Sequence, residues 1–92
     1  MILNTKHKLF FSKNFINKFG KFSEGYQKLI LGKLHLLGNN PRHPSLRTKK
    51  LNRWDELIES SINMDIRLIW QYDDDDIIIQ DIGHHDILKK YG

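Results

Sequence analysis

Three short segments hold the side chains that could do chemistry, namely Arg42–Lys50, Asp65–Arg67 and Gly83–Asp86. Between them they supply imidazole, carboxylate and guanidinium groups. An imidazole can give or take a proton near neutral pH, and a guanidinium can stabilise negative charge on phosphoryl oxygens. Such a set of groups can cleave RNA without a metal ion, because a general base lets the 2′-hydroxyl group attack the adjacent phosphate.

Arg67 is the most informative of these residues, because it lies in a stretch that alternates apolar and polar side chains from Met64 to Tyr72. Such alternation predicts a strand, and a strand holds a side chain rigidly. A guanidinium placed in this way suits bidentate binding of a phosphate. The structural alternative is an ion pair with Asp65 or Glu59, and the sequence leaves both interpretations open.

Two adjacent histidines, His84 and His85, follow Gly83 at the end of another predicted strand. Neighbouring side chains of an extended chain point in opposite directions, so at most one of the two imidazoles faces a given site. A strand end without any function is the alternative. The order His-His-Asp lacks the helical spacing of common zinc motifs. We therefore predict no metal site and no cofactor.

The basic first half of the chain favours contact with a polyanion. Residues 1–50 contain eleven lysines and arginines and one acid, whereas residues 51–92 contain four and ten, and the net charge is +4. Clustered cations gain affinity for phosphates by releasing counterions. The residues predicted to contact an RNA backbone are Arg47, Lys49, Lys50 and Arg53. Simple solvation of loop charges is the alternative.

The elements that would position these groups begin with a predicted strand over Lys6–Phe11. Ser12 could cap a helix that ends at Gly20, and Ser23 could cap a second helix. Apolar residues of the second helix recur three and four positions apart, and its predicted stop is the run Gly38–Pro41. Two basic amphipathic helices therefore follow one short strand.

The remaining elements are predicted to be strands, over Glu56–Ser60, Met64–Tyr72 and Ile77–Ile82, with a turn at Asp73–Asp76 and a short turn or helix over His84–Tyr91. The sum is an α+β domain in which two N-terminal helices pack on one face of a small twisted antiparallel sheet. The other face would be open to a partner, and Asp65, Arg67 and Gln71 would point into it. Trp70 is predicted to lie in the core, and the role of Trp54 is left open.

Length and composition narrow the class of protein. The 92 residues suffice for one domain, and the absence of cysteine excludes disulfide scaffolds and thiolate metal sites. The sequence contains no signal peptide and no stretch of about 20 apolar residues that could span a membrane. We therefore predict a single cytoplasmic domain, residues 1–92, without a membrane partner.

The second half of the chain resembles the RelE/ParE superfamily of small bacterial toxins. The segments that carry the resemblance, in order, are Asn40-Pro41, His43–Leu46, Leu57–Ser60, Asp65–Trp70 and Asp81–Asp86. The resemblance implies two helices against a twisted antiparallel sheet and a cognate antitoxin that blocks the active face. It also implies cleavage of messenger RNA, in many members on the ribosome, by a toxin of a type II toxin–antitoxin system.

The resemblance assigns roles to individual residues. Arg67 resembles the strand arginine of the nuclease members, and His85 resembles the histidine of their Gly-x-His motif. His43 and Asp65 match a further histidine and aspartate of one nuclease branch, in which another histidine stands where this chain has Ser61. The catalytic set implied is therefore Arg67, His85, His43 and Asp65, while His84 joins the residues that bind RNA.

Two alternatives belong to other classes of function. The ParE branch of the superfamily inhibits DNA gyrase, and such a binder would need no proton-transfer groups. A degenerate relative would bind only its antitoxin, and the replacement at Ser61 keeps that alternative open. The histidine-rich end of the chain favours the nuclease. Oligomeric state is not predicted.

Overall fold

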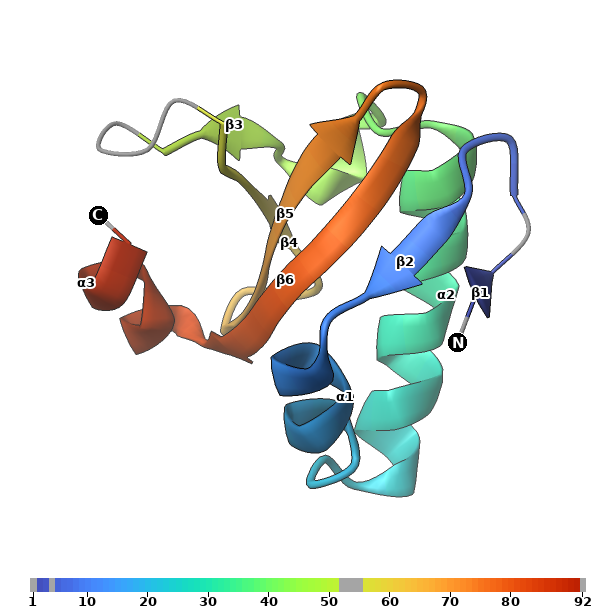
Figure 1. Ribbon diagram of the computed structural model, residues 1–92. Coiled ribbons are helices and arrows are strands. Elements are labelled where there is room, and N and C mark those ends of the chain that lie inside the picture. Colours follow the sequence, from blue (N-terminus) through green and yellow to red (C-terminus); the bar gives the residue numbers. More distant parts are fainter. Residues whose placement is uncertain (1, 4, 52–55, 92) are drawn as a thin grey trace.

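The computed structural model describes residues 2–3, 5–51 and 56–91, and these fold around one six-stranded sheet (Figure 1). The strands are β1 (Ile2–Leu3), β2 (Leu9–Phe11), β3 (Lys49–Lys50), β4 (Ile58–Ser61), β5 (Ile66–Asp73) and β6 (Asp76–His84). The helices are α1 (Lys13–Phe19), α2 (Glu24–Asn39) and α3 (Leu88–Tyr91), with single 3₁₀ turns at Pro44–Leu46 (η1) and His85–Ile87 (η2). The prediction of an α+β domain is confirmed.

Both N-terminal helices begin where serine caps were predicted. The Ser12 hydroxyl accepts a hydrogen bond from the Phe15 amide at 3.0 Å, and the Ser23 hydroxyl accepts one from the Tyr26 amide at 3.3 Å. These bonds satisfy amide groups that have no partner within the first turn of a helix. The fully buried residues of α2 recur at helical spacing and are Ile30, Leu34 and Leu37.

The strand order is β1-β2-β6-β5-β4-β3, which makes the sheet wider than predicted and mixed in direction. Strand β5 pairs antiparallel with both β4 and β6, as expected, but β2 pairs parallel with β6 through Leu9 and Ile77. Parallel pairing requires a long crossover between the two strands. Helices α1 and α2 and the strands β3 to β5 provide that crossover.

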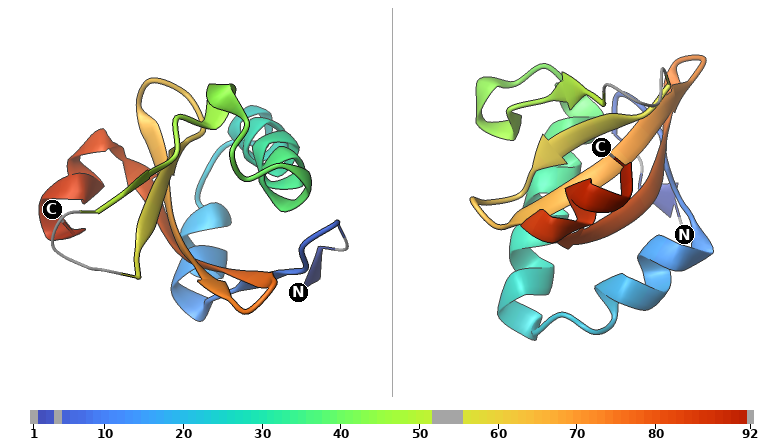
Figure 2. Two further views of the ribbon diagram at one scale, coloured as in Figure 1. Left: turned by 90° about the horizontal axis from the view of Figure 1, so that it is seen from above. Right: turned by 90° about the vertical axis from the view of Figure 1, so that its left-hand side faces the viewer.

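Helices α1 and α2 cover one face of the sheet, while η2 and α3 lie on the opposite face (Figure 2). The main core lies under α1 and α2, and Trp70 is fully buried there, as predicted. Its indole N–H donates to the Ser60 hydroxyl at 2.9 Å, so the polar end of the buried ring is satisfied. No helix in the described part of the chain is long and apolar enough to span a membrane.

The second face is not fully open, which differs from the prediction. Ile69 is fully buried there against Leu51 and Ile87, and Leu57, Leu88 and Tyr91 pack around these three. This second, smaller core cluster forms because the apolar residues of η2 and α3 lie on the side of these turns that faces the sheet. Arg67 and Gln71, two residues to either side of Ile69 on β5, share its face.

A β-bulge interrupts the pairing of β5 with β6. Ile69 lies opposite Asp81 whereas Trp70 lies opposite Ile79, so Gln80 is an extra residue without a partner on β5. Two residues of β6 oppose one residue of β5 at this bulge. Beyond it, the side chains of β6 therefore alternate between the two faces of the sheet in the opposite order. As a result Asp81 lies opposite Ile69 on the face that α3 covers, while Ile79 and Ile82 lie in the main core.

Candidate functional site

Arg67 lies at the start of β5, opposite Gly83 of β6 and Ser61 of β4. Its Nη1 donates a hydrogen bond to the Asn63 carbonyl at 2.6 Å, and its Nε lies 3.8 Å from a carboxylate oxygen of Glu59. The side chain is 14% exposed, so the surrounding protein covers most of it. Arg67 was predicted nearer the middle of a strand, and the difference arises because the strand begins at Ile66.

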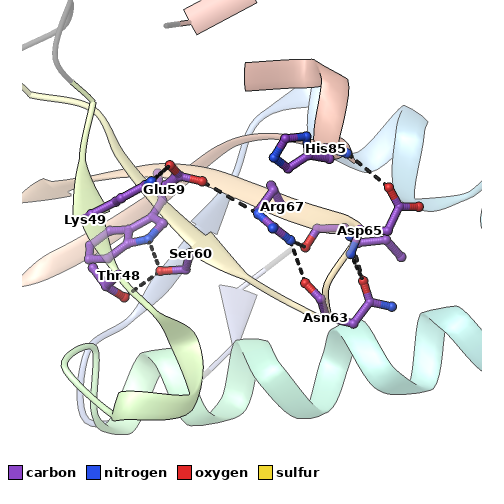
Figure 3. Close-up of polar contacts among 10 residues, drawn as sticks. Thr48, Lys49, Glu59, Ser60, Asn63, Asp65, Arg67 and His85 are labelled. Carbon is purple, nitrogen blue, oxygen red and sulfur yellow. Dashed lines mark hydrogen bonds and ion pairs between the residues drawn. The ribbon is translucent and has the colours of Figure 1, made fainter. Parts of the chain in front are cut away.

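Asn63 explains this late start of β5. Its side-chain oxygen accepts hydrogen bonds from the backbone amides of Asp65 at 2.8 Å and Ile66 at 2.6 Å (Figure 3). An asparagine that binds the backbone ahead of it forms a tight turn and keeps these residues out of the ladder. Met64 is 83% exposed in this turn, so the predicted start of the strand at Met64 is wrong.

Glu59 joins Arg67 to the basic segment. Its carboxylate is almost fully buried and lies 3.4 Å from Lys49 Nζ as well as 3.8 Å from Arg67 Nε (Figure 3). The structural alternative considered for Arg67, an ion pair with Glu59, is therefore present. A buried carboxylate between two cations fixes both of them in place, so Glu59 also orders the site.

Asp65 holds the segment that contains both histidines. One carboxylate oxygen accepts a hydrogen bond from His84 Nδ1 at 2.6 Å, and the other accepts one from the His85 backbone amide at 3.2 Å. The hydrogen bonds from His84 and from the His85 amide lower the pKa of the Asp65 carboxyl below its ordinary value of 3.8. The carboxylate thereby ties the end of β6 to the turn before β5.

The two imidazoles diverge, as the sequence predicted for neighbours in extended chain. His84 lies opposite Ile66 in the ladder, and its ring packs 5.8 Å from the ring of Phe22, between the helices and the end of β6. His85 begins η2, and its ring lies on the same side as the Arg67 side chain (Figure 3). The structure thus brings Arg67, Asp65 and His85 to one end of the sheet.

His43 is placed elsewhere. Its Nδ1 accepts a hydrogen bond from the Ser45 amide at 3.1 Å and contacts the Ser45 hydroxyl at 2.9 Å, so it caps η1. It lines a hollow of about 500 Å³ together with Arg47, Lys49 and Lys50. The described lining of this hollow contains none of Arg67, Asp65 and His85. The structure does not join His43 to the other three predicted catalytic residues.

The basic segment is anchored to the sheet by an internal hydrogen bond. The Thr48 hydroxyl lies 2.7 Å from that of Ser60 and donates to the Pro41 carbonyl at 3.1 Å. Lys49 and Lys50 then form the edge strand β3, both with exposed side chains. Arg53 and Trp54 lie outside the described residues, so their predicted roles are not placed.

Sequence reasoning missed the contributions of Asn63, Thr48 and Ser60. The asparagine carried a signal, since Asn63 stands directly before a predicted strand and asparagine favours turns at such positions. Thr48 and Ser60 carried none, because the bond between them depends on how the basic segment packs against β4.

No family model and no curated protein sequence matches this chain. Solved structures do match. A chain of the DinJ–YafQ toxin–antitoxin complex of E. coli has a TM-score of 0.70 and 18% identity, over 90% of this chain and 97% of that one. A chain of the archaeal RelE–RelB complex of Pyrococcus horikoshii has a TM-score of 0.71 and 15% identity, over 87% and 96%. The fold is that of the RelE-type toxins.

A further match gives the same result. A chain of the YoeB dimer of Staphylococcus aureus has a TM-score of 0.64 and 23% identity, over 84% of this chain and 94% of that one. The matches therefore span nearly the whole RelE-type fold rather than one motif. Within this fold the cluster of Arg67, Asp65 and His85 lies where the last strand gives way to the C-terminal turns.

Proposed function

We propose that this protein is the toxin of a type II toxin–antitoxin system and an endoribonuclease that cleaves messenger RNA on the ribosome without a metal ion. The observation that supports the proposal most strongly is the placement of Arg67 and His85 on one side of the sheet, with Asp65 bound to the backbone of His85 (Figure 3). A fixed cation beside a proton-transfer group meets the chemical needs of phosphoryl transfer.

The proposed reaction is an internal transesterification. The 2′-oxygen attacks phosphorus and loses its proton, the bond from phosphorus to the 5′-oxygen breaks, and the 5′-oxygen gains a proton. The products are a 2′,3′-cyclic phosphate and a 5′-hydroxyl group. Arg67 stabilises the charge that develops on the phosphoryl oxygens, and His85 transfers one of the two protons.

The second proton-transfer group is proposed to come from the ribosome. Ser61, opposite Arg67, has no acid–base function near neutral pH, and the carboxylate of Glu59 is engaged by Arg67 and Lys49. Ribosomal RNA completes the site in this proposal, which is why cleavage depends on translation. Arg47, Lys49 and Lys50 hold the RNA backbone in this proposal, whereas His84 packs against Phe22 and binds Asp65.

An antitoxin is the proposed protein partner. The similar structures include YafQ in complex with DinJ and RelE in complex with RelB. An acidic, partly disordered chain would bind the basic surface of this protein and fold on it. Such a partner would keep messenger RNA away from Arg67 and His85.

The test is primer extension on messenger RNA from cells that are induced to produce the wild-type protein or the variant Arg67→Ala/His85→Ala. We expect new 5′ ends inside translated reading frames with the wild type and none with the double variant. The matched control is Lys28→Ala, because Lys28 pairs with exposed Glu24 on the surface of α2 and its replacement should leave cleavage unchanged. Circular dichroism establishes that each variant is folded.

Other outcomes would replace the proposal. Growth arrest with intact messages, together with inhibition of DNA supercoiling by purified gyrase, would point to a ParE-like inhibitor. A folded wild-type protein that causes neither arrest nor cleavage would be a relative that only binds its antitoxin. Cleavage of purified RNA without ribosomes would contradict the ribosome dependence but not the nuclease.

A further inference from the structure

Two glutamine side chains meet on the face of the sheet that carries Arg67. Gln71 of β5 and Gln80 at the bulge of β6 are joined by a hydrogen bond of 2.8 Å from Gln80 Nε2 to Gln71 Oε1. The bulge places Gln80 in this position, since it is the residue of β6 left without a partner on β5. This pair is separate from the Arg67, Asp65 and His85 cluster.

The glutamine pair lines a hollow of about 680 Å³. Ser12, Asn14 and Tyr91 contribute to its walls, and Glu56 is the one charged residue of the described lining. A volume of this order suits a small planar ligand. The described lining contains no cation, in contrast to the basic hollow that Lys49 and Lys50 line.

The free hydrogen-bonding groups define what the hollow can recognise. The Ser12 hydroxyl is engaged with the Gln80 carbonyl and the Phe15 amide, and the Tyr91 hydroxyl is engaged with Asp81. The bond between the two amides uses one donor of Gln80 and the oxygen of Gln71 as acceptor. Among the described residues, the NH₂ group of Gln71 and the side-chain oxygen of Gln80 have no other partner, so the pair offers a donor and an acceptor.

We propose that this hollow binds a nucleobase of the RNA and reads its edge through Gln71 and Gln80. A neighbouring donor and acceptor match the edge of a base, as side-chain amides do when they bind adenine. Lys90 Nζ lies over one face of the Tyr91 ring, 5.4 Å from its centroid, and the other face offers a surface for stacking. Gln71 is four residues from Arg67 along β5, about 13 Å at the rise of a strand, so the base belongs to a nucleotide near the one cleaved.

This inference deepens the proposed function, and its test separates the two. The probes are pentanucleotides of A, C, G or U in which every 2′-hydroxyl group is methylated, so that they bind but cannot be cleaved. We expect the wild-type protein to bind one of the four about ten-fold more tightly than the weakest. Its binding should shift the side-chain amide signals of Gln71 and Gln80 in nuclear magnetic resonance spectra.

Three variants complete the experiment. Gln71→Leu and Gln80→Leu should each reduce the preference to about two-fold or less while the basic hollow still binds RNA. Gln71→Glu has the same shape but replaces the free donor with an acceptor, so it should change which base is preferred. Equal binding of all four probes by the wild type, or an unchanged preference in Gln71→Leu, would overturn the inference. Absence of cleavage in cells with the preference intact would overturn only the nuclease.

Discussion

At the scale of single residues, the site depends on carboxylates that hold other groups in place. Glu59 fixes Arg67 and Lys49, and Asp65 fixes the backbone of His85 and the ring of His84. The sequence presented Arg67 as either a phosphate ligand or a structural ion pair. The structure contains the ion pair, with Glu59 beside Nε, and the Asn63 carbonyl accepts a hydrogen bond from Nη1; a phosphate role for the same side chain stays a proposal.

The buried ion pair gives a stability prediction. Glu59→Ala should lower the free energy of unfolding by about 3 kcal/mol, because Arg67 is left mostly buried without its counter-charge. The double variant Glu59→Ala/Arg67→Ala should cost less than the sum of the two single variants. Urea denaturation of the four proteins gives both quantities. Strict additivity would show that the pair contributes no coupling energy.

Asp65 gives a prediction about pH. Since its pKa is lowered in the folded state, the carboxylate adds stability above its ordinary value of 3.8, and this stability is lost as the pH falls through the lower, folded value. Carbon-13 resonance titration should place the Asp65 pKa below 3.8 in the wild type. In His84→Ala, which lacks the largest cause, the pKa should move toward 3.8. An identical pKa in both proteins would exclude the His84 bond as the cause.

At the scale of elements, the bulge of β6 organises the second face of the sheet. It brings Asp81 under α3, where the fully buried carboxylate accepts hydrogen bonds from Lys18 Nζ at 2.7 Å, the Tyr91 hydroxyl at 2.7 Å and the Ile82 amide at 2.9 Å. Burial opposes ionisation, yet the bonds from Lys18 and Tyr91 hold the pKa of Asp81 below its ordinary value. Asp81 thus binds α1 and α3 to the same strand.

These contacts of Asp81 predict the effect of replacing it. Asp81→Ala should lower the free energy of unfolding by about 2 kcal/mol, since it removes the hydrogen bonds that Lys18 and Tyr91 donate to a buried carboxylate. Tyr91→Phe, which removes one hydrogen bond, should cost only about 1 kcal/mol. Hydrogen exchange at residues 85–91 should become faster in Asp81→Ala than in Tyr91→Phe. Equal exchange in the two variants would show that Asp81 does not hold α3.

Much of this element order could be predicted from local signals. Ser12 and Ser23 marked the helix starts, and the alternation before Tyr72 marked β5. The bulge could not be predicted, because the run of isoleucines in β6 shows no alternation that a change of phase would break. The parallel pairing of β2 with β6 could not be predicted either, since it depends on the order of the strands in the sheet rather than on any residue of Leu9–Phe11.

The candidate site was predictable only in part, for a related reason. Arg67, Asp65 and His85 lie on segments that pair directly with one another, so strand order brings them together. His43 belongs to a turn on the far side of β4, and its Nδ1 is taken by Ser45. The contact between Gln71 and Gln80 depends on the bulge of β6, so it could not be predicted from the sequence. The packing of the elements, which the sequence does not give, therefore decides which of the predicted site residues lie together.

At the scale of the whole molecule, the net charge of +4 matters through its distribution. The hollow lined by Arg47, Lys49 and Lys50 concentrates cations at one edge of the sheet, and Lys49 is partly neutralised by Glu59. Binding of RNA to this surface should therefore depend strongly on salt, because each phosphate contact releases counterions.

The substitution Lys50→Ala tests whether the basic hollow binds RNA. In a titration with methylated oligonucleotide at several salt concentrations, Lys50→Ala should reduce the slope of log affinity against log salt by about 1. Lys28→Ala removes the same charge from the surface of α2 and should leave the slope unchanged. Equal slopes for all three proteins would place the RNA on another surface.

The position of β6 in the sheet also has a consequence for how the protein is made. This strand lies between β2 and β5, yet its partner residues Leu9 and Ile77 are 68 positions apart in the chain. Contacts of such separation slow folding, because a long loop must close before they form. A nascent chain cannot assemble the sheet, and with it the face bearing Arg67 and His85, until residues 76–84 have been synthesised. The candidate site is therefore completed only after the ribosome has translated residue 85.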